Sequence, residues 1–270
     1  MSLTDEEAAR PLAWSRIALG TLFLLRTTPV LVPLRLDFTA DAYPLLGWPS
    51  SAWHGAALWG LGAPPVVIAV ACVARTAAAL CFTLGYRTAW AGVIAGLSGY
   101  FVLFQQPFGF NATLHLLLQG VMLVGLTDAG AALAVRAVPA RNPASGKLLI
   151  RAFLASIYFW AAVVKLRADW LDGRTLALFH ENGALSGAVA DLLLSTESLR
   201  SLIACSIVAT ELSLPVLFFM PRTRRWAPFV ALSLHGCIEV VAAPDLIGWA
   251  MAALLLSTTL PRNEDAGTGT

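Results

Sequence analysis

The sequence predicts an all-α integral membrane protein, a polytopic bundle of about eight transmembrane helices with both termini in the cytoplasm. Three observations lead to this fold class: the composition, the succession of apolar runs and the distribution of basic residues. Hydrophobic residues fill 58% of the 270 positions and charged residues only 13%, whereas soluble domains carry about 25% charged residues. This composition argues against a water-soluble globule, and the high apolar content also argues against a disordered chain.

Eight apolar runs are bounded by proline, glycine and charged residues, which are typical helix ends. A membrane-spanning helix needs about 20 mostly apolar residues. The runs cover residues 12–32, 64–85, 88–106, 111–127, 147–167, 199–220, 225–242 and 245–260. We therefore expect a cytoplasmic N-terminus over 1–11, one transmembrane domain over 12–260 and a flexible tail over 261–270.

Two connecting segments are expected to lie on the membrane surface. The 33–63 loop contains Trp48, Trp53 and Trp59, and tryptophan favours the membrane–water interface. The weakly apolar stretch 184–195 is too short to span a bilayer, so we expect an interfacial helix there.

Basic residues in the loops set the orientation, because cytoplasmic loops carry an excess of Lys and Arg. With the N-terminus inside, nine basic residues fall on the inner side and three or four on the outer side. The inner set is Arg10, Arg87, Arg136, Arg141, Lys147, Arg222, Arg224, Arg225 and Arg262; the outer set is Arg35, Arg167 and Arg174, with Arg200 at a helix edge. The net charge of +2 gives no electrostatic reason to expect a nucleic-acid partner.

Ionisable side chains within the apolar runs are candidates for function, because charges in lipid are costly and usually face the bundle interior. These residues are Arg26, Arg75, His115, Lys165, Glu211, His235 and Glu239. The topology places several of them in the outer half of the membrane, where a closed bundle can hold a small-molecule pocket. His235 and Glu239 are spaced i, i+4 and share a helix face, which suggests proton transfer.

Each of these residues also has a structural interpretation. Arg75 and Glu211 can form an ion pair that holds two helices together, and Arg26 can serve a structural purpose in the first helix. Lys165 near a helix end can extend to the headgroups, and His115 can donate a hydrogen bond between helices. Asn111-Ala-Thr113 also fits a glycosylation sequon, a pattern that often occurs by chance.

The four cysteines, Cys72, Cys81, Cys205 and Cys237, all fall in apolar runs and form no CxxC or CxxH motif. We therefore interpret them as buried, inert thiols. No metal site is predicted.

Several motifs resemble the HTTM (horizontally transferred transmembrane) domain family, which includes the membrane domain of vitamin K-dependent gamma-glutamyl carboxylase. The most specific is Tyr158-Phe-Trp-Ala-Ala-Val-Val-Lys165-Leu-Arg-Ala-Asp-Trp170-Leu-Asp-Gly173, which is similar to the lysine segment of the carboxylase. The weaker matches follow in the family's order. They are Arg16-Ile-Ala-Leu-Gly20, Leu84-Gly85-Tyr86-Arg87, Asn111 through Asp128, Glu211 through Phe219, His235, and Ile247-Gly248-Trp249.

The resemblance implies an enzyme in a bacterial inner membrane. In the carboxylase the lysine deprotonates vitamin K hydroquinone on the extracytoplasmic side, and oxygen addition then gives an alkoxide that removes a proton from glutamate. Lys165 takes the place of that lysine and His235 that of a functional histidine. A lysine acts as a base only in its neutral form, which desolvation favours. The implied cofactor is a reduced quinone, vitamin K hydroquinone or a menaquinol-like lipid, and the implied substrate-binding residues are Tyr158, Trp170, His115, Asn111 and Glu239.

The chain also departs from the carboxylase pattern. Val164 replaces a lysine, and the carboxylase's fourth-helix histidine aligns with Thr113. His115 lies two residues away, which rotates it about 200° around a helix. The large soluble domain that follows the helices in the carboxylase is not present in these residues, so we do not expect carboxylation of a tethered protein substrate.

The leading hypothesis is an intramembrane enzyme with Lys165 as base, acting on a quinol-type lipid and through it on a second substrate. The alternative, suggested by short bacterial members of the family, is a maturation factor for a secreted toxin-like peptide that works with a partner protein. A transporter is a weaker alternative. An apolar pocket at Lys165 would favour the enzyme, and a continuous polar path would favour transport.

Overall fold

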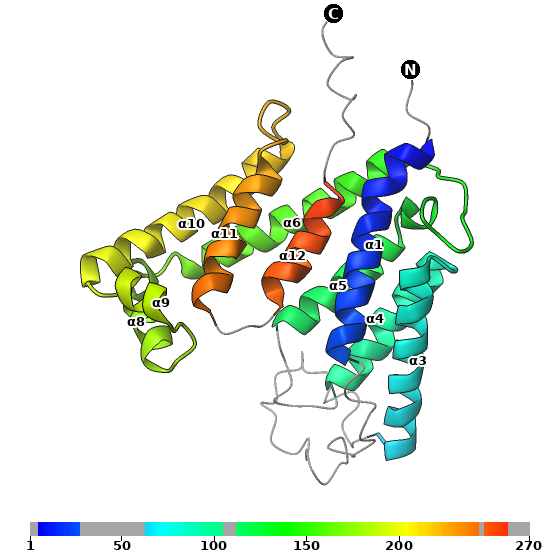
Figure 1. The fold of residues 1–270 in the computed structure, drawn as a ribbon, viewed down its shortest axis with the longest axis horizontal. Helices are drawn as coiled ribbons and strands as arrows, with labels where there is room; N and C mark the ends of the chain where they lie inside the picture. Colours follow the sequence, from blue (N-terminus) through cyan, green and yellow to red (C-terminus); the bar gives the residue numbers. More distant parts are fainter. Residues whose placement is uncertain (1–4, 28–62, 105–111, 243–245, 259–270) are drawn as a thin grey trace, which may run out of the picture. The chain divides into compact units, whose positions relative to one another are not determined.

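A computed structural model describes residues 5–27, 63–104, 112–242 and 246–258, and its named elements are all helices (Figure 1). The predictions for the tryptophan-containing 33–63 loop, for Asn111 and for the 261–270 tail lie outside the described residues. The chain divides into two compact units, residues 1–147 and 148–270, which are described in turn.

The all-α prediction is confirmed, and a helix occurs in each of the eight apolar runs. These helices are α1 (Asp5–Thr27), α3 (Pro65–Leu84), α4 (Thr88–Phe104), α5 (Ala112–Gly125), α6 (Pro143–Lys165), α10 (Glu197–Phe219), α11 (Ala227–Val241) and α12 (Ile247–Leu256).

The largest boundary errors occur at two helix starts. α1 begins at Asp5 instead of residue 12, since three acidic residues in its first turn suit the positive end of the helix dipole. Much of the expected N-terminal tail is therefore helical. α6 begins at Pro143, because the Asn142 side chain caps the helix by accepting from the N–H of Ser145 at 3.0 Å.

Among the residues that the structure describes, three helical segments are long and apolar enough to cross a membrane: Val66–Leu84, Pro143–Lys165 and Glu197–Phe219. Four further apolar helices, α4, α5, α11 and α12, are shorter. The architecture is that of a membrane protein. The number of eight membrane spans and the cytoplasmic location of both termini remain predictions.

The first unit contains α1, α3, α4, α5 and the short 3-10 helix η2 (Asp128–Gly130). α1 packs against α3 and α5, and α4 packs against both α3 and α5. Phe23, Phe82 and Leu117 are fully buried in its core. α4 and α5 approach closely at Gly92, where a Cβ atom would lie 2.6 Å from the carbonyl oxygen of Val121; only glycine fits there.

A buried arginine connects α1 to the segment after α5. The Arg16 side chain is fully buried. Its guanidinium group donates to the carbonyl oxygens of Ala129 at 2.5 Å and Ala132 at 3.2 Å, and also to that of Leu133. Because buried polar groups need hydrogen-bond partners, Arg16 and these carbonyls stabilise each other.

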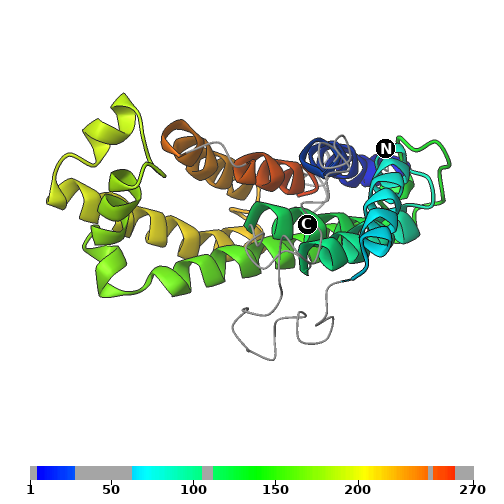
Figure 2. The same ribbon diagram turned by 90° about the horizontal axis from the view of Figure 1, so that it is seen from below.

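The second unit contains the rest of α6, then α7 (Ala168–Leu171), α8 (Arg174–Glu181), α9 (Ala188–Leu193), α10, α11 and α12. α6 and α10 run antiparallel alongside each other (Figure 2). Lys165 contacts Glu211, and seven residues away on each helix the Tyr158 ring stacks on Phe218. The short helix expected over 184–195 is present as α9.

α8 and α9 lie beside the N-terminal part of α10 (Figure 1). The N–H of Ser186 donates to the carbonyl of Val241 at 2.8 Å and so attaches the connection between α8 and α9 to the end of α11. His180 lies 3.0 Å from the carbonyl oxygen of Leu185 and 3.3 Å from a carboxylate oxygen of Asp191. These contacts hold the two short helices together.

Candidate functional site

An apolar pocket of about 210 Å³ lies within the second unit. α8 and α9 form one side, and α10 and α11 form the other. Lys165 and Glu211 are the only charged residues among those that line it. The apolar lining residues are Trp170, Leu176, Phe179, Leu185, Ala190, Leu193, Leu194, Ile203, Ile207, Ile238 and Val241.

Lys165 and Glu211 form a close ion pair at the wall of this pocket. The Lys165 ammonium lies 2.7 and 2.9 Å from the two carboxylate oxygens of Glu211 and 3.1 Å from the carbonyl oxygen of Ala161. The Lys165 side chain is 20% exposed and that of Glu211 is 8% exposed. The lysine therefore contacts a buried carboxylate. A lysine that only extends to the lipid headgroups would not need this contact.

The local sequence explains how both side chains reach the pocket. Lys165 is the last residue of α6, and its ammonium contacts both the carbonyl of Ala161 in the last turn of that helix and Glu211 on α10. Glu211 lies four residues before Pro215 in α10. Proline has no N–H, so the carbonyl of Glu211 loses its usual helical partner and the helix is weakened at this position.

The turn after Lys165 is fixed against α10. Gly173 has a φ of +82°, and a Cβ atom there would lie 2.6 Å from Cβ of Arg200, so glycine is required on both counts. The hydroxyl of Ser201 donates to the carbonyl of Leu171 at 2.7 Å. Outside the helices, the backbone N–H and the guanidinium of Arg174 hold the pKa of Asp172 below its usual value.

Trp170 lines the pocket beside the ion pair. The Lys165 ammonium lies 5.4 Å from the centre of its ring, within the range of a cation–π interaction. The ring also makes an edge contact with Phe179 at 6.1 Å. The indole Nε1 is buried and has no hydrogen-bond partner among the described residues.

A second polar pair lies within the same unit. The hydroxyl of Tyr158 is 3.0 Å from Nε2 of His235, and the tyrosine is only 2% exposed. Nδ1 of His235 is buried and has no partner within the described part of the chain. Tyr158 and Lys165 lie seven residues apart, which places them on the same face of α6. Neither Tyr158 nor His235 lines the pocket.

Comparison with protein families gives one match. The model of the HTTM domain matches residues 57–259, three quarters of the chain. The chain belongs to the HTTM family. No curated protein and no solved structure gives a match.

In this HTTM protein the lysine segment, Tyr158 through Gly173, supplies four of the residues that shape the site and its surroundings. Lys165 and Trp170 line the pocket, Tyr158 contacts His235, and Gly173 makes the turn. The structural interpretation that paired Glu211 with Arg75 is contradicted by the contacts of both residues. The Glu211 carboxylate pairs with Lys165, while Arg75 donates to the carbonyl of Thr27 at 3.1 Å.

Other predicted site residues lie elsewhere. Oε1 of Glu239 accepts from the N–H of Gly248 at 3.0 Å and so caps α12, although it shares a helix face with His235. Nδ1 of His115 lies 2.8 Å from the hydroxyl of Tyr100, so the interpretation of His115 as a link between helices is confirmed. Arg26 is exposed in the last turn of α1.

Two residues were missed as determinants of the structure. His180 links α8 to α9, and Arg16 was quoted only as part of a motif. An arginine within an otherwise apolar run, such as Arg16, is a signal that is visible in the sequence. The contacts of His180 depend on a turn that has no apolar periodicity. The four cysteines are free thiols, but the prediction that all are buried is wrong, because Cys205 and Cys237 are exposed.

Proposed function

We propose that this HTTM protein is an intramembrane enzyme that removes a proton from a quinol-type lipid bound in the Lys165 pocket. One observation carries the proposal: an ion pair between a half-buried lysine and a buried carboxylate forms part of an otherwise apolar pocket. Apolar walls suit a quinol ring, and a charged pair in such surroundings interacts more strongly than in water. An apolar pocket at Lys165 also favours an enzyme over a transporter.

The pair provides a route for the proton. A charged lysine has no lone pair, so it takes a substrate proton only as it gives one of its own away. The quinol hydroxyl gives its proton to Nζ of Lys165, and Lys165 transfers one to the carboxylate 2.7 Å away. The result is a quinolate anion, a lysine that is still positively charged and a neutral Glu211. The lysine then stabilises the anion that the transfer creates.

Trp170 adds an orienting donor. Its indole N–H has no partner, and a buried donor without a partner costs about 1–3 kcal/mol. A quinol or quinone oxygen that accepts this hydrogen bond would be fixed relative to Lys165. On the family resemblance, the site opens to the extracytoplasmic side of a bacterial inner membrane, and the second substrate is a secreted peptide or a partner protein.

The test is turnover of menaquinol by Lys165→Arg in membranes with matched protein levels. Guanidinium stays protonated and has no lone pair, so we expect activity to fall at least about a hundredfold, the usual contribution of a general base. Arg167→Gln is the matched control, because it removes an exposed basic side chain two residues away and should leave turnover unchanged. Near-normal turnover by Lys165→Arg, with intact folding, would falsify the proposal.

A further inference from the structure

A second cavity, independent of the Lys165 pocket, lies in the first unit and is rich in arginine. Its volume is about 510 Å³. Arg87 lines it from the turn between α3 and α4, and Arg136 and Arg141 line it from the segment between η2 and α6. All three arginines are exposed.

The positive charge of this cavity is not neutralised within the described part of the chain. None of the three arginines there forms an ion pair with a carboxylate. Asp128 is the one acidic residue in the lining. Its Oδ2 accepts from the backbone N–H groups of Arg141 at 3.1 Å and Asn142 at 2.6 Å. Three positive side chains against one carboxylate leave a surplus that suits an anion.

The start of α4 adds further donors to the same cavity. The N–H of Ala91 bonds to the carbonyl of Arg87 at 3.0 Å, so the N–H groups of the three residues before Ala91 have no acceptor within the helix. Thr88 lies in the cavity wall and is only 7% exposed, and its hydroxyl oxygen has no partner in the segments that the structure describes. Free N–H groups at the positive end of a helix bind phosphate readily.

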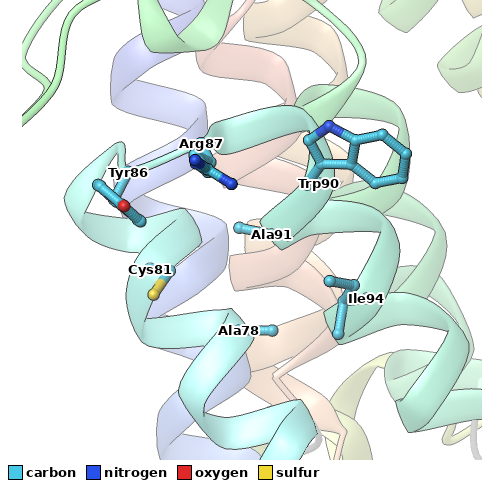
Figure 3. A pocket seen from close by; sticks show the side chains of 7 residues that line it. All are labelled: Ala78, Cys81, Tyr86, Arg87, Trp90, Ala91 and Ile94. Carbon is cyan, nitrogen blue, oxygen red and sulfur yellow. The ribbon is translucent and has the colours of Figure 1, made fainter.

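An apolar groove adjoins the arginine-rich cavity (Figure 3). It has a volume of about 350 Å³ and lies between α3, which contributes Ala78 and Cys81, and α4, which contributes Ile94. Arg87 and Trp90 line both the groove and the cavity. Figure 3 shows Arg87 at one end of the groove and Ala78 and Ile94 toward the other. The two hollows together present a basic end and an apolar end.

We propose that this part of the first unit binds an anionic phospholipid, with the phosphate among Arg87, Arg136 and Arg141 and an acyl chain along the α3–α4 groove. Basic pockets between transmembrane helices are suited to anionic headgroups. A soluble phosphate compound would use the cavity alone. The adjoining groove, with Trp90 70% exposed and Ile94 47% exposed, favours a ligand that has a hydrocarbon chain.

The test uses the purified full-length protein and native mass spectrometry of retained lipid. Phosphatidylglycerol is titrated against phosphatidylcholine with the same acyl chains, and glycerol phosphate serves as the headgroup without chains. We expect phosphatidylglycerol to bind at least tenfold more tightly than either. The double variant Arg136→Gln, Arg141→Gln should weaken its binding roughly thirtyfold, because each basic side chain near an anionic headgroup contributes about 1 kcal/mol.

The matched control is Arg222→Gln with Arg225→Gln, which removes the same charge from another basic segment where both arginines are exposed. This control should bind phosphatidylglycerol like the unaltered protein. Equal losses in both double variants would show a diffuse charge effect and overturn the site. Equal binding of phosphatidylcholine would also overturn it, and binding of glycerol phosphate as tight as that of the lipid would assign the cavity to a soluble phosphate. Thermal unfolding of each variant shows whether the fold is retained.

Discussion

The two units of the protein bury positive charge in different ways. In the first unit the guanidinium of Arg16 meets main-chain carbonyls of the segment after α5. In the second unit the ammonium of Lys165 meets the carboxylate of Glu211 and lines an apolar pocket. Both arrangements supply the hydrogen bonds that a buried cation requires.

The difference lies in the partner. A carbonyl oxygen accepts a hydrogen bond but does not take up a proton under physiological conditions, whereas a carboxylate does both. Arg16 also stays protonated throughout. The geometry of Arg16 therefore restricts it to stabilising the fold, while Lys165 and Glu211 can exchange a proton with each other and with a ligand. The same distinction separates variants that should lose stability from variants that should lose activity.

The largest expected effect is on stability, in Arg16→Met. The substitution keeps a long apolar side chain and leaves three carbonyl acceptors without their donor. Each buried unsatisfied group costs about 1–3 kcal/mol, so we expect a loss of about 3 kcal/mol or more in the free energy of unfolding. Thermal unfolding of the purified protein measures it. Arg10→Met, at an exposed position of the same helix, is the control, and a loss of equal size there would show that Arg16 has no special place in the fold.

Glu211→Gln should lower activity more than stability, the opposite of Arg16→Met. The amide still accepts a hydrogen bond from Lys165 but takes up no proton, so turnover of the quinol should fall about a hundredfold with only a modest change in stability. Glu197→Gln, at an exposed acid at the start of the same helix, should leave turnover unchanged. If Glu211→Gln retains normal turnover, the carboxylate is a structural partner only and the contrast between the units disappears.

Trp170→Phe removes the indole N–H and keeps an aromatic ring against Lys165. A single neutral hydrogen bond contributes about 0.5–1.5 kcal/mol, so quinol binding should weaken about fivefold and turnover at saturation should change less. Titration of the quinol in equilibrium binding measures the effect. Trp160→Phe, at an exposed position on α6, is the control. Unchanged binding by Trp170→Phe would mean that the indole donor does not face the ligand.

Glu239→Gln should have the smallest effect. The amide oxygen still accepts from Gly248, and only the charge near the N-terminus of α12 is lost, which costs about 0.3–1 kcal/mol. Turnover should stay the same. A loss of turnover comparable to that of Glu211→Gln would show that Glu239 belongs to the functional site, as its i, i+4 spacing with His235 suggested.

How well the helices and the site residues could be predicted depends on how far apart in the sequence the interacting residues lie. Helix existence depends on local apolar composition, and every apolar run contains a helix. The importance of Lys165 and Trp170 followed from a local motif. The partner of Lys165 did not, because the pairing of α6 with α10 joins residues 46 positions apart and neither spacing nor composition specifies it. The starts of α1 and α6 depend on the acidic residues that begin at Asp5 and on the Asn142 cap, which are polar signals that the pattern of apolar runs does not contain.

The antiparallel register of α6 and α10 has a consequence for chain length. Tyr158 and Lys165 are two helical turns apart, and each contacts a residue that is correspondingly spaced on the facing helix. Inserting one residue between them would turn Lys165 by about 100° around α6, away from Glu211, even if every side chain were kept. Inserting seven would restore the direction but displace the lysine by about 10 Å along the axis. The interval from 158 to 165 therefore tolerates changes of residue type far more readily than changes of length.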